Sequence, residues 1–456
     1  MIKKILGKKG LFVLFLLIDV TCFSQNKSER PANHVILISI DGFRPDFYLE
    51  EKWPAPNLKQ MVKDGVCAEG VRSVFPSVTY PSHTTIITGA LPAKHGIFYN
   101  SPFESNGQTG KWYWETELIK IPTLWHAVKQ AGMKSANFRW PVSVGAPVDY
   151  NIPEVWSLED GYGRIQPMRD HEFPKGLLAE MEQEVLGKMN ERTFNGDYLN
   201  REDRIGEMAA YVLEIYKPNF MTIHLTATDH FQHEQGREGP KVYTSLAASD
   251  RAIGKIIESA ERSGILENTT FVVVGDHGFV NIHAALSPNV WLVEEGLMED
   301  SKDRGNWKAA FHTSGASAFL MLKDPKDKAT LQLVTKKLNS LPEKYKKLFK
   351  IVDRKALNEI GADPNAMLAL APNPGIAMSS STNGDVLKKR AGGTHGYFPD
   401  FKEIETGFVA WGAGIGKGKE IHHMRLEDIA PLIRHLLNID FETPDGVLYK
   451  GILERE

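Results

Sequence analysis

The stretch HVILISIDG, residues 34–42, decides the fold, because a short apolar strand here ends in the carboxylate of Asp41. Two later stretches repeat the pattern. FVVVGDHG (271–278) ends in Asp276 and His277, and MTIHLTATDHFQH (221–233) carries Asp229 and His233. Open parallel sheets bind ligands outside the carboxyl ends of their strands. Three such segments each carry an aspartate, and two of them also carry a histidine. Together they indicate a metal site with two ions at one edge of the sheet.

Strand-like and helix-like segments alternate along the chain. Apolar runs are expected to form strands at Val35–Ile40, Phe220–Leu225, Thr270–Val274, Ala316–Leu322 and Phe408–Trp411. Amphipathic stretches at Gly206–Tyr216 and Val242–Arg262 are expected to be helices. This alternation predicts an α/β fold, a three-layer αβα sandwich around a mainly parallel sheet covered on both faces.

The interval 281–390 separates the second aspartate–histidine pair, Asp276 and His277, from the next candidate ligand, His395. It contains a strand, a Lys-rich helix expected at Lys326–Lys347, and a Pro/Ala/Gly-rich piece at Ala362–Gly375. We interpret it as a small β-containing subdomain inserted into a main domain of residues 30–452.

Bulk composition favours a globular enzyme or small-ligand protein. Hydrophobic residues make up 42% of the 456 residues and charged residues 24%, so a large core can form. The net charge of −3 gives no electrostatic reason to expect a nucleic-acid polymer as partner.

The N-terminus has the pattern of a secretory signal peptide over residues 1–24. Four lysines precede the apolar run LFVLFLLI (11–18), and Ser24 offers a small residue for cleavage. The run is too short to span a bilayer, so no transmembrane segment is expected in the mature chain. Removal of the signal takes Cys22 and leaves Cys67 as the single thiol. Export without disulfides favours a bacterial periplasm or an extracellular location.

The most distinctive segment is FPSVTYPSHTTIITGALPAKHGIFYN, residues 75–100. Pro81 suits a first helical position, which places Thr79 at or just before a helix N-terminus. The free amides and positive dipole end there suit a phosphoryl group, and a hydroxyl there suits attack on phosphorus. Taken alone, Thr79 would more simply be a helix cap.

The candidate ligands indicate a metal site only when they are taken together, because a single Asp after a strand is often only a turn residue. Asp229 and His233 are four apart, so a helical turn puts both on one face. Carboxylates mixed with neutral imidazoles suit zinc. The candidates are Asp41, Asp229, His233, Asp276, His277 and, in GGTHGYFPD, His395.

These motifs together resemble the nucleotide pyrophosphatase/phosphodiesterase family of the alkaline phosphatase superfamily. The resemblance rests on IDGFRPDF, TYPSHTTIITG with HGIFYN, the D-x-x-x-H pair, GDHG and THGY, and runs from Asn33 to His395. It implies an alkaline phosphatase-like fold and two Zn²⁺ ions. One ion would be held by Asp41, Thr79, Asp276 and His277, the other by Asp229, His233 and His395. Asn100 matches the residue that binds a phosphoryl oxygen.

The resemblance also implies a two-step hydrolysis of phosphodiester or pyrophosphate bonds through a phospho-threonine at Thr79. Asn100 and the amide of Tyr80 would stabilise the non-bridging oxygens. Tyr80 also offers an aromatic ring to a small-molecule substrate, where nucleotide-cleaving relatives have phenylalanine. Four substrate classes stay open: nucleotides, nucleotide sugars, dinucleotides and phospholipid head groups. Nucleotide-type substrates are favoured.

Tryptophans and arginines leave the substrate open. Any of Trp112, Trp114, Trp125 and Trp140 could stack a base or cage a choline cation, and we expect one or two at most to line the pocket. Arg139 and Val142 interrupt the family's F-F-W-P-G-type stretch.

Two other functions remain as alternatives. A phosphomonoesterase would use the same metals but would need a cation for the extra charge of a monoester, from Arg139, Arg164 or Lys94. A non-catalytic metal- or phosphate-binding protein is less favoured, because no ligand position is replaced.

Overall fold

The computed structural model describes residues 30–159, 163–300 and 305–455. The predicted signal peptide (1–24) lies outside these residues. In the described part of the chain, no helix is long and apolar enough to cross a membrane.

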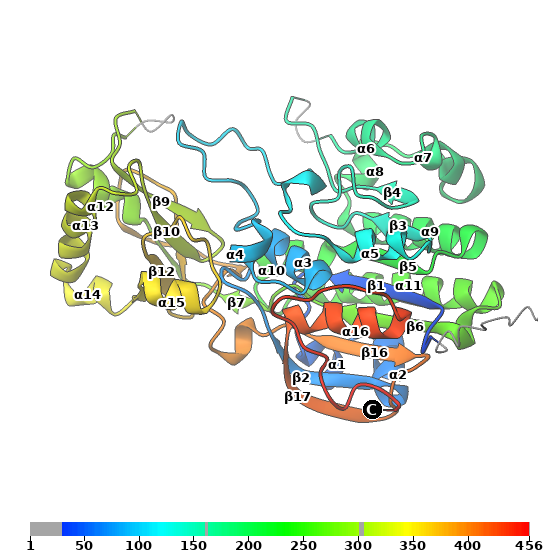
Figure 1. The fold of residues 1–456 in the computed structure, drawn as a ribbon. Coiled ribbons are helices and arrows are strands. Elements are labelled where there is room, and N and C mark those ends of the chain that lie inside the picture. The colour runs from blue at the N-terminus through cyan, green and yellow to red at the C-terminus, as the bar shows by residue number, and fades with distance from the viewer. Residues whose placement is uncertain (1–29, 160–162, 301–304, 456) are drawn as a thin grey trace, which may run out of the picture.

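An eight-stranded sheet forms the centre of the molecule (Figure 1). β1 (His34–Ile40) lies in its middle, parallel to β5 (Phe220–Leu225) and β6 (Thr269–Val274). The strand order of the eight-stranded sheet is β17-β2-β16-β6-β1-β5-β3-β4. The outer strands are β2 (Val66–Arg72), β3 (Ser135–Phe138), β4 (Tyr150–Ile152), β16 (Phe408–Gly412) and β17 (Lys419–Arg425). Only β16 runs antiparallel to its neighbours, β6 and β2, so the predicted mainly parallel sheet is confirmed.

Helices cover both faces of this sheet. On β1, Ile36 and Ile38 face one core, whereas Val35 and Leu37 face the other. The first core packs against α2 (Pro56–Asp64), α9 (Tyr198–Tyr216) and α11 (Pro240–Arg262). The second packs against α3 (Thr79–Thr88), α5 (Leu124–Gln130) and α16 (Ile429–Leu437). The alternation of buried residues along one strand therefore produces the expected three-layer sandwich.

Residues between β6 and β16 form three smaller sheets: a two-stranded one of β7 (Val280–Asn281) and β15 (Gly393–Thr394), and two larger ones that share a hydrophobic cluster (Figure 1, left). One of the larger sheets has the order β11-β12-β10-β9, made of β9 (Ala309–Ser314), β10 (Ser317–Leu322), β11 (Phe349–Val352) and β12 (Ala369–Pro372). The other has the order β13-β8-β14, made of β8 (Ala284–Leu286), β13 (Ile376–Met378) and β14 (Leu387–Lys389). The helices here are α12 (Pro288–Glu294), α13 (Lys328–Ser340), α14 (Glu343–Lys346) and α15 (Arg354–Glu359). The boundaries 281–390 of an inserted subdomain stay a prediction.

The expected helix at Lys326–Lys347 is wrong in its extent. It is divided into α13 and α14, with Leu341 extended at ψ 145° before Pro342. The residue before a proline is disfavoured in the helical region, so the chain turns here.

Candidate metal centre

Five segments bring the predicted ligands to one edge of the central sheet. Asp41 follows β1, and Asp276 and His277 follow β6. Asp229 and His233 lie on α10 (Ala227–Gln235), which begins directly after β5. The remaining two come from more distant elements: Thr79 is the first residue of α3, and His395 follows the short strand β15 (Gly393–Thr394).

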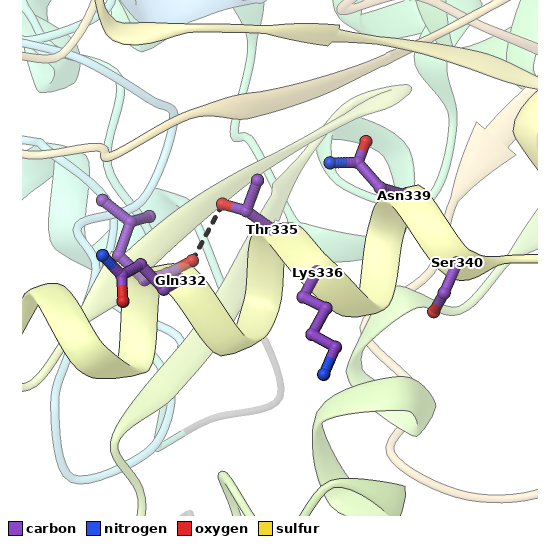
Figure 2. Close-up of a pocket in the computed structure, with 6 residues that line it drawn as sticks. Gln332, Thr335, Lys336, Asn339 and Ser340 are labelled. Atoms are coloured by element: carbon purple, nitrogen blue, oxygen red, sulfur yellow. Dashed lines mark hydrogen bonds between the residues drawn. The ribbon is translucent and has the colours of Figure 1, made fainter.

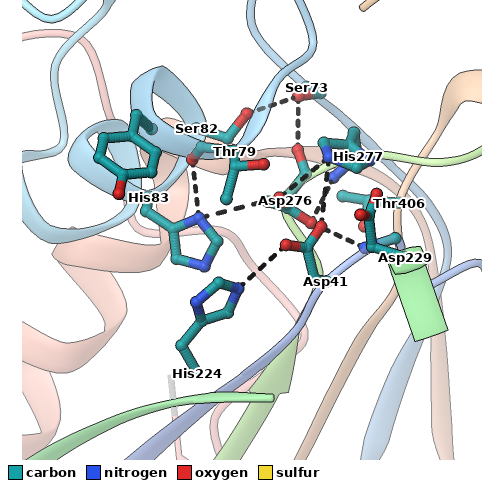
Figure 3. A network of polar contacts seen from close by, with 12 residues as sticks. Asp41, Ser73, Thr79, Ser82, His83, His224, Asp229, Asp276, His277 and Thr406 are labelled. Atoms are coloured by element: carbon teal, nitrogen blue, oxygen red, sulfur yellow. Dashed lines mark hydrogen bonds and ion pairs between the residues drawn. The ribbon is translucent and has the colours of Figure 1, made fainter. Parts of the chain in front are cut away.

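Asp41, Asp276 and His277, which we call the inner cluster, are all buried. Nε2 of His277 lies 3.1 Å from Oδ2 of Asp276 and 3.4 Å from Oδ1 of Asp41 (Figure 3). These three residues offer ligand atoms close enough together to hold one metal ion.

Asp229, His233 and His395, the outer cluster, lie next to the inner one. Oδ1 of Asp229 is 3.4 Å from Nε2 of His233 and 3.5 Å from Nε2 of His395. The rings of His395 and His277 are stacked 3.5 Å apart, and Asp229, His277 and His395 form a second group with metal-ligand spacing. His277 therefore stands between the two clusters instead of belonging to one alone.

Each histidine of the two clusters is anchored through Nδ1. The nitrogen donates to a backbone carbonyl in all three: His277 to Gly278 at 3.1 Å, His233 to Gly393 at 3.0 Å, and His395 to Ser77 at 3.0 Å. This fixes the tautomer and leaves Nε2 as the free ligand atom.

The inner carboxylates are oriented in the same way. Oδ1 of Asp276 accepts the amides of Gly42 and His277, and Oδ2 of Asp41 lies 3.2 Å from His224 Nε2. Four inward atoms have no hydrogen-bond partner among the described residues: Asp41 Oδ1, Asp229 Oδ1, Asp276 Oδ2 and His277 Nε2. This donor set fits a divalent cation.

The pKa values show how strongly the clusters favour positive charge. Burial and the neighbouring carboxylates of Asp229 and Asp276 raise the pKa of Asp41 well above its usual value. Burial alone would lower the pKa of His277, but Asp276, Asp41 and Asp229 raise it to about 9. A bound cation would supply the charge that these protons otherwise provide.

Thr79 is 8% exposed and is the N-terminal residue of α3, as expected. The helix begins at Thr79 instead of at Pro81, so the prediction for Pro81 is wrong by two positions. A proline is still tolerated there because the first amides of a helix have no partner within the helix. The backbone carbonyl of Thr79 accepts a hydrogen bond from His83 Nδ1 at 2.7 Å.

The predicted substrate contacts differ in one respect from expectation. The amide of Tyr80 donates to Oδ1 of Asn100 at 2.9 Å, so it is already engaged. The same bond orients Asn100 and leaves its Nδ2 as the donor. The Tyr80 ring is 1% exposed, so protein atoms cover both faces, and the ring lies edge-on to Trp112 at 5.1 Å.

The tryptophans fall into two groups. Trp125 and Trp140 are fully buried, and their indole nitrogens donate to Thr222 Oγ1 and to the His83 carbonyl, each at 3.3 Å. Trp112 and Trp114 are half-buried and both pack edge-on against Trp156, at 5.0 and 5.1 Å.

Two polar residues beside the inner cluster, His224 and Glu154, were missed by the sequence interpretation, and a third, Arg139, was named there only as a departure from the family pattern and a possible cation for a monoester. His224 reaches Asp41, Glu154 Oε2 lies 3.6 Å from His224 Nδ1, and Arg139 pairs with Glu154 Oε1 at 2.9 Å. His224 sits in the buried strand β5, where a polar residue among TIHL was the available signal. Arg139 and Val142 both have positive φ, 60° and 58°, conformations that favour glycine.

Two other histidines, His283 and His312, follow GDHGFV in the sequence. His312 is buried on β9, with its ring 4.5 Å from that of Tyr99. His283 is exposed and donates its backbone amide to Gly375.

The fold and this site define a class: α/β proteins with a candidate metal centre at the carboxyl edge of a mainly parallel sheet. Within that class the chain belongs to the type I phosphodiesterase/nucleotide pyrophosphatase family, whose model matches residues 35–398.

Two curated relatives illustrate the similarity. A venom phosphodiesterase of Naja atra is 25% identical over 445 residues, covering 92% of this chain and 46% of that protein. Human ectonucleotide pyrophosphatase/phosphodiesterase family member 1 is 23% identical over 444 residues, covering 92% and 42%. The chain thus spans about half the length of the curated relatives it matches.

Solved structures share the fold. An inactive form of murine ectonucleotide pyrophosphatase/phosphodiesterase 5 in complex with AMP has a TM-score of 0.65 at 19% identity, covering 91% of this chain and 97% of that one. Human ectonucleotide pyrophosphatase/phosphodiesterase 5 gives the same values. The predicted alkaline phosphatase-like α/β fold is therefore confirmed.

Proposed function

We propose that the chain hydrolyses phosphodiester or pyrophosphate bonds at a centre of two zinc ions, with Thr79 as the nucleophile. The observation that carries the proposal is the anchoring of every cluster histidine through Nδ1, which turns Nε2 inward beside the carboxylates. Family membership supports the reaction class. Nucleotide-type substrates are favoured, since a structural relative is described in complex with AMP.

The inner cluster and Thr79 would hold one ion, and the outer cluster would hold the other. Bound zinc supplies Lewis-acid charge that offsets the negative charge developing on the phosphoryl oxygens. The position of Thr79 at the start of α3 adds the positive end of the helix dipole.

The chain's own residues account for the rest of the reaction. Thr79 gives its hydroxyl proton to solvent and its Oγ1 forms a bond to phosphorus as the bond to the leaving oxygen breaks, which gives a phospho-threonine and a leaving group that takes up a proton from water. Asn100, held by the Tyr80 amide, donates from Nδ2 to a non-bridging oxygen. Water then attacks phosphorus and releases Thr79.

The charges near the site support a diesterase over a monoesterase. Lys94 pairs with Asp445 at 2.5 Å and Arg139 pairs with Glu154, so both cations are already neutralised. The extra negative charge of a monoester would lack a free cation from either, and the third candidate, Arg164, is separated from Tyr80 by Trp112 and Trp156. A purely binding role is less favoured, because the nucleophile and all six ligand side chains are retained.

We also propose a secreted or periplasmic location. The basic and apolar N-terminal pattern supports it. The names of the venom and ecto-type relatives agree with export.

Hydrolysis of bis-p-nitrophenyl phosphate and p-nitrophenyl phosphate, with and without chelator, tests the function. We expect turnover of the diester that chelator abolishes and added zinc restores. A large preference for the monoester would contradict the diesterase assignment. Turnover of neither ester by zinc-loaded protein would favour a binding role.

A further inference from the structure

Three buried or half-buried arginines converge beside the candidate metal centre. Arg139 follows β3, Arg201 lies on α9, and Arg164 precedes α6 (Ile165–His171). The guanidinium carbons of Arg139 and Arg201 lie 5.7 and 5.8 Å from the ring of Phe194, between them. Asn195 joins the other pair: it accepts from Arg164 Nε at 2.8 Å and from Arg201 Nη2 at 2.7 Å.

The positive charge of this group is only partly balanced. Within the described residues, Arg139 alone has a carboxylate within ion-pair distance, Glu154 at 2.9 Å, and Glu154 also lies near His224. Arg201 donates to backbone carbonyls. Burial and the neighbouring guanidinium groups of Arg139 and Arg201 lower the pKa of Arg164 to about 9. A buried cation without a partner is unfavourable and favours an anion nearby.

An aromatic wall connects Arg164 with the candidate nucleophile. The Tyr80 ring, next to Thr79, lies 5.1 Å from Trp112, which lies 5.0 Å from Trp156, and the Arg164 guanidinium covers Trp156 at 4.7 Å. A substituent on a phosphoryl group at Thr79 would pass along this wall.

The wall presents unused hydrogen-bond donors. In the described part of the chain, these side-chain atoms are buried without a hydrogen-bond partner: Tyr80 Oη, Trp114 Nε1, Trp156 Nε1, Arg139 Nε and Arg164 Nη1. Indole and guanidinium nitrogens can only donate. Two carboxylate oxygens of neighbouring residues, Glu154 Oε2 and Glu115 Oε2, also lack a hydrogen-bond partner among the residues that the structure describes, so donors outnumber acceptors. Because buried polar groups are nearly always satisfied, the remaining donors point to an acceptor that binds here.

We propose that Arg164, with Trp156, binds a phosphate or carboxylate carried by the substituent of the scissile phosphoryl group. The inference rests on the proposed hydrolysis and narrows its substrates to phosphodiesters with an additional anionic group. Trp112 and Trp156 lie between Arg164 and Tyr80, so the arginine serves the substituent and not the phosphoryl group itself.

The same geometry disfavours choline esters. A quaternary ammonium would bind over an indole face, but the guanidinium of Arg164 already occupies a face of Trp156. The like charges would also repel each other.

Three p-nitrophenyl esters with the same leaving group test the proposal: thymidine 5′-(p-nitrophenyl phosphate), the same compound with a 3′-phosphate, and p-nitrophenyl phosphocholine. We expect kcat/KM for the 3′-phosphate compound to exceed that for the plain thymidine ester by roughly ten- to a hundredfold, the range of one charge-assisted hydrogen bond. The phosphocholine ester should be the poorest substrate.

The variant Arg164→Gln should abolish this preference, mainly through KM, and Arg164→Lys should retain part of it. Arg169→Gln is the matched control, because Arg169 lies on α6, five residues after Arg164, and pairs with Glu182 at 2.7 Å. The control should keep the preference. Circular dichroism spectra matching the wild type would show that the variants fold.

Equal kcat/KM for the two thymidine esters, or a preference that survives Arg164→Gln, would overturn the arginine site and leave the hydrolase intact. If zinc-loaded protein cleaves none of the esters, the proposed function fails, and calorimetry still decides the site. Thymidine 3′,5′-bisphosphate should then bind the wild type at least tenfold more tightly than thymidine 5′-monophosphate does, and the difference should vanish in Arg164→Gln. Equal affinities of the wild type for the two nucleotides would refute the arginine site.

A cavity on the surface of the smaller sheets' helices offers, among the described residues, no comparable set of buried, unpartnered donors. The cavity of about 700 Å³ in Figure 2 lies along α13 and is lined by Leu331, Gln332, Thr335, Lys336, Asn339 and Ser340. Thr335 there only donates to the backbone carbonyl of Leu331 at 2.8 Å, the ordinary bond of a helical threonine.

Discussion

Protonation of His95 is expected to loosen the helix that carries Thr79 when the pH falls. His95 ends α4 (Pro92–His95) and is fully buried. Its Nδ1 accepts the amide of Ile97 at 3.1 Å, so Nε2 carries the proton and donates to Thr85 Oγ1 on α3 at 3.0 Å. A second proton on Nδ1 would break the bond from Ile97. Burial accordingly lowers the pKa of His95 to about 3 from the usual 6.5.

The sign of the effect follows from linkage between protonation and folding. As the pH falls below 6.5, the unfolded chain binds this proton first, so His95 makes the folded state progressively less stable down to about pH 3. With these two pKa values, the free energy of unfolding should fall by about 3 kcal/mol between about pH 7 and pH 4 because of His95 alone.

Urea unfolding followed by tryptophan fluorescence, in chelator at several pH values, measures this loss. His95→Gln cannot take up the proton and should lose less stability over this range by about that amount. The variant also lacks the bond to Ile97, which should cost roughly 1 kcal/mol at every pH. His171→Gln, at an exposed histidine, is the control and should follow the wild type. Equal losses of stability in the wild type and His95→Gln would refute the reasoning.

Three further substitutions test the site. Thr79→Ala should lower diester turnover by at least about a thousandfold while metal content stays unchanged, since the six remaining side chains still hold the ions; near-normal turnover with full metal would rule out the covalent route. Asp229→Asn should weaken one zinc more than the other, and metal analysis showing equal loss of both would contradict the two-cluster assignment. Gly278→Ala should destabilise the protein by roughly 1–3 kcal/mol and weaken metal binding, because a Cβ would lie 2.5 Å from the carbonyl oxygens of Glu403 and Glu405 beside His277. Gly416→Ala is the control, because Gly416 lacks a positive φ and its Cβ would meet only the flexible side chain of Lys419, at 3.1 Å. An equal fall in melting temperature for both variants would argue against the steric explanation.

The central strands were predictable because they are continuous apolar runs buried on both faces. β5 occupies Phe220–Leu225, as predicted, and β6 begins one residue before the predicted Thr270. The sequence also predicted that Asp229 and His233 lie on the same face of a helix, because positions i and i+4 of a helix share a face. These features are local, so the sequence alone contains them.

The wall of the site could not be predicted, because it depends on contacts between distant segments. Arg139, Glu154 and His224 meet only when β3, β4 and β5 are aligned in the sheet. Trp156 was not singled out at all, yet it contacts Trp112, Trp114 and Arg164. Side chains that converge from separate elements leave no periodic signal in the sequence.

Anomalous diffraction from crystals grown with zinc would show directly whether the two clusters each hold a metal ion. We expect two peaks per chain, one within bonding distance of Asp41, Asp276 and His277 and the other within bonding distance of Asp229, His233 and His395. Thr79 Oγ1 should lie beside the first peak. A single peak, or peaks away from these side chains, would contradict the proposed metal centre.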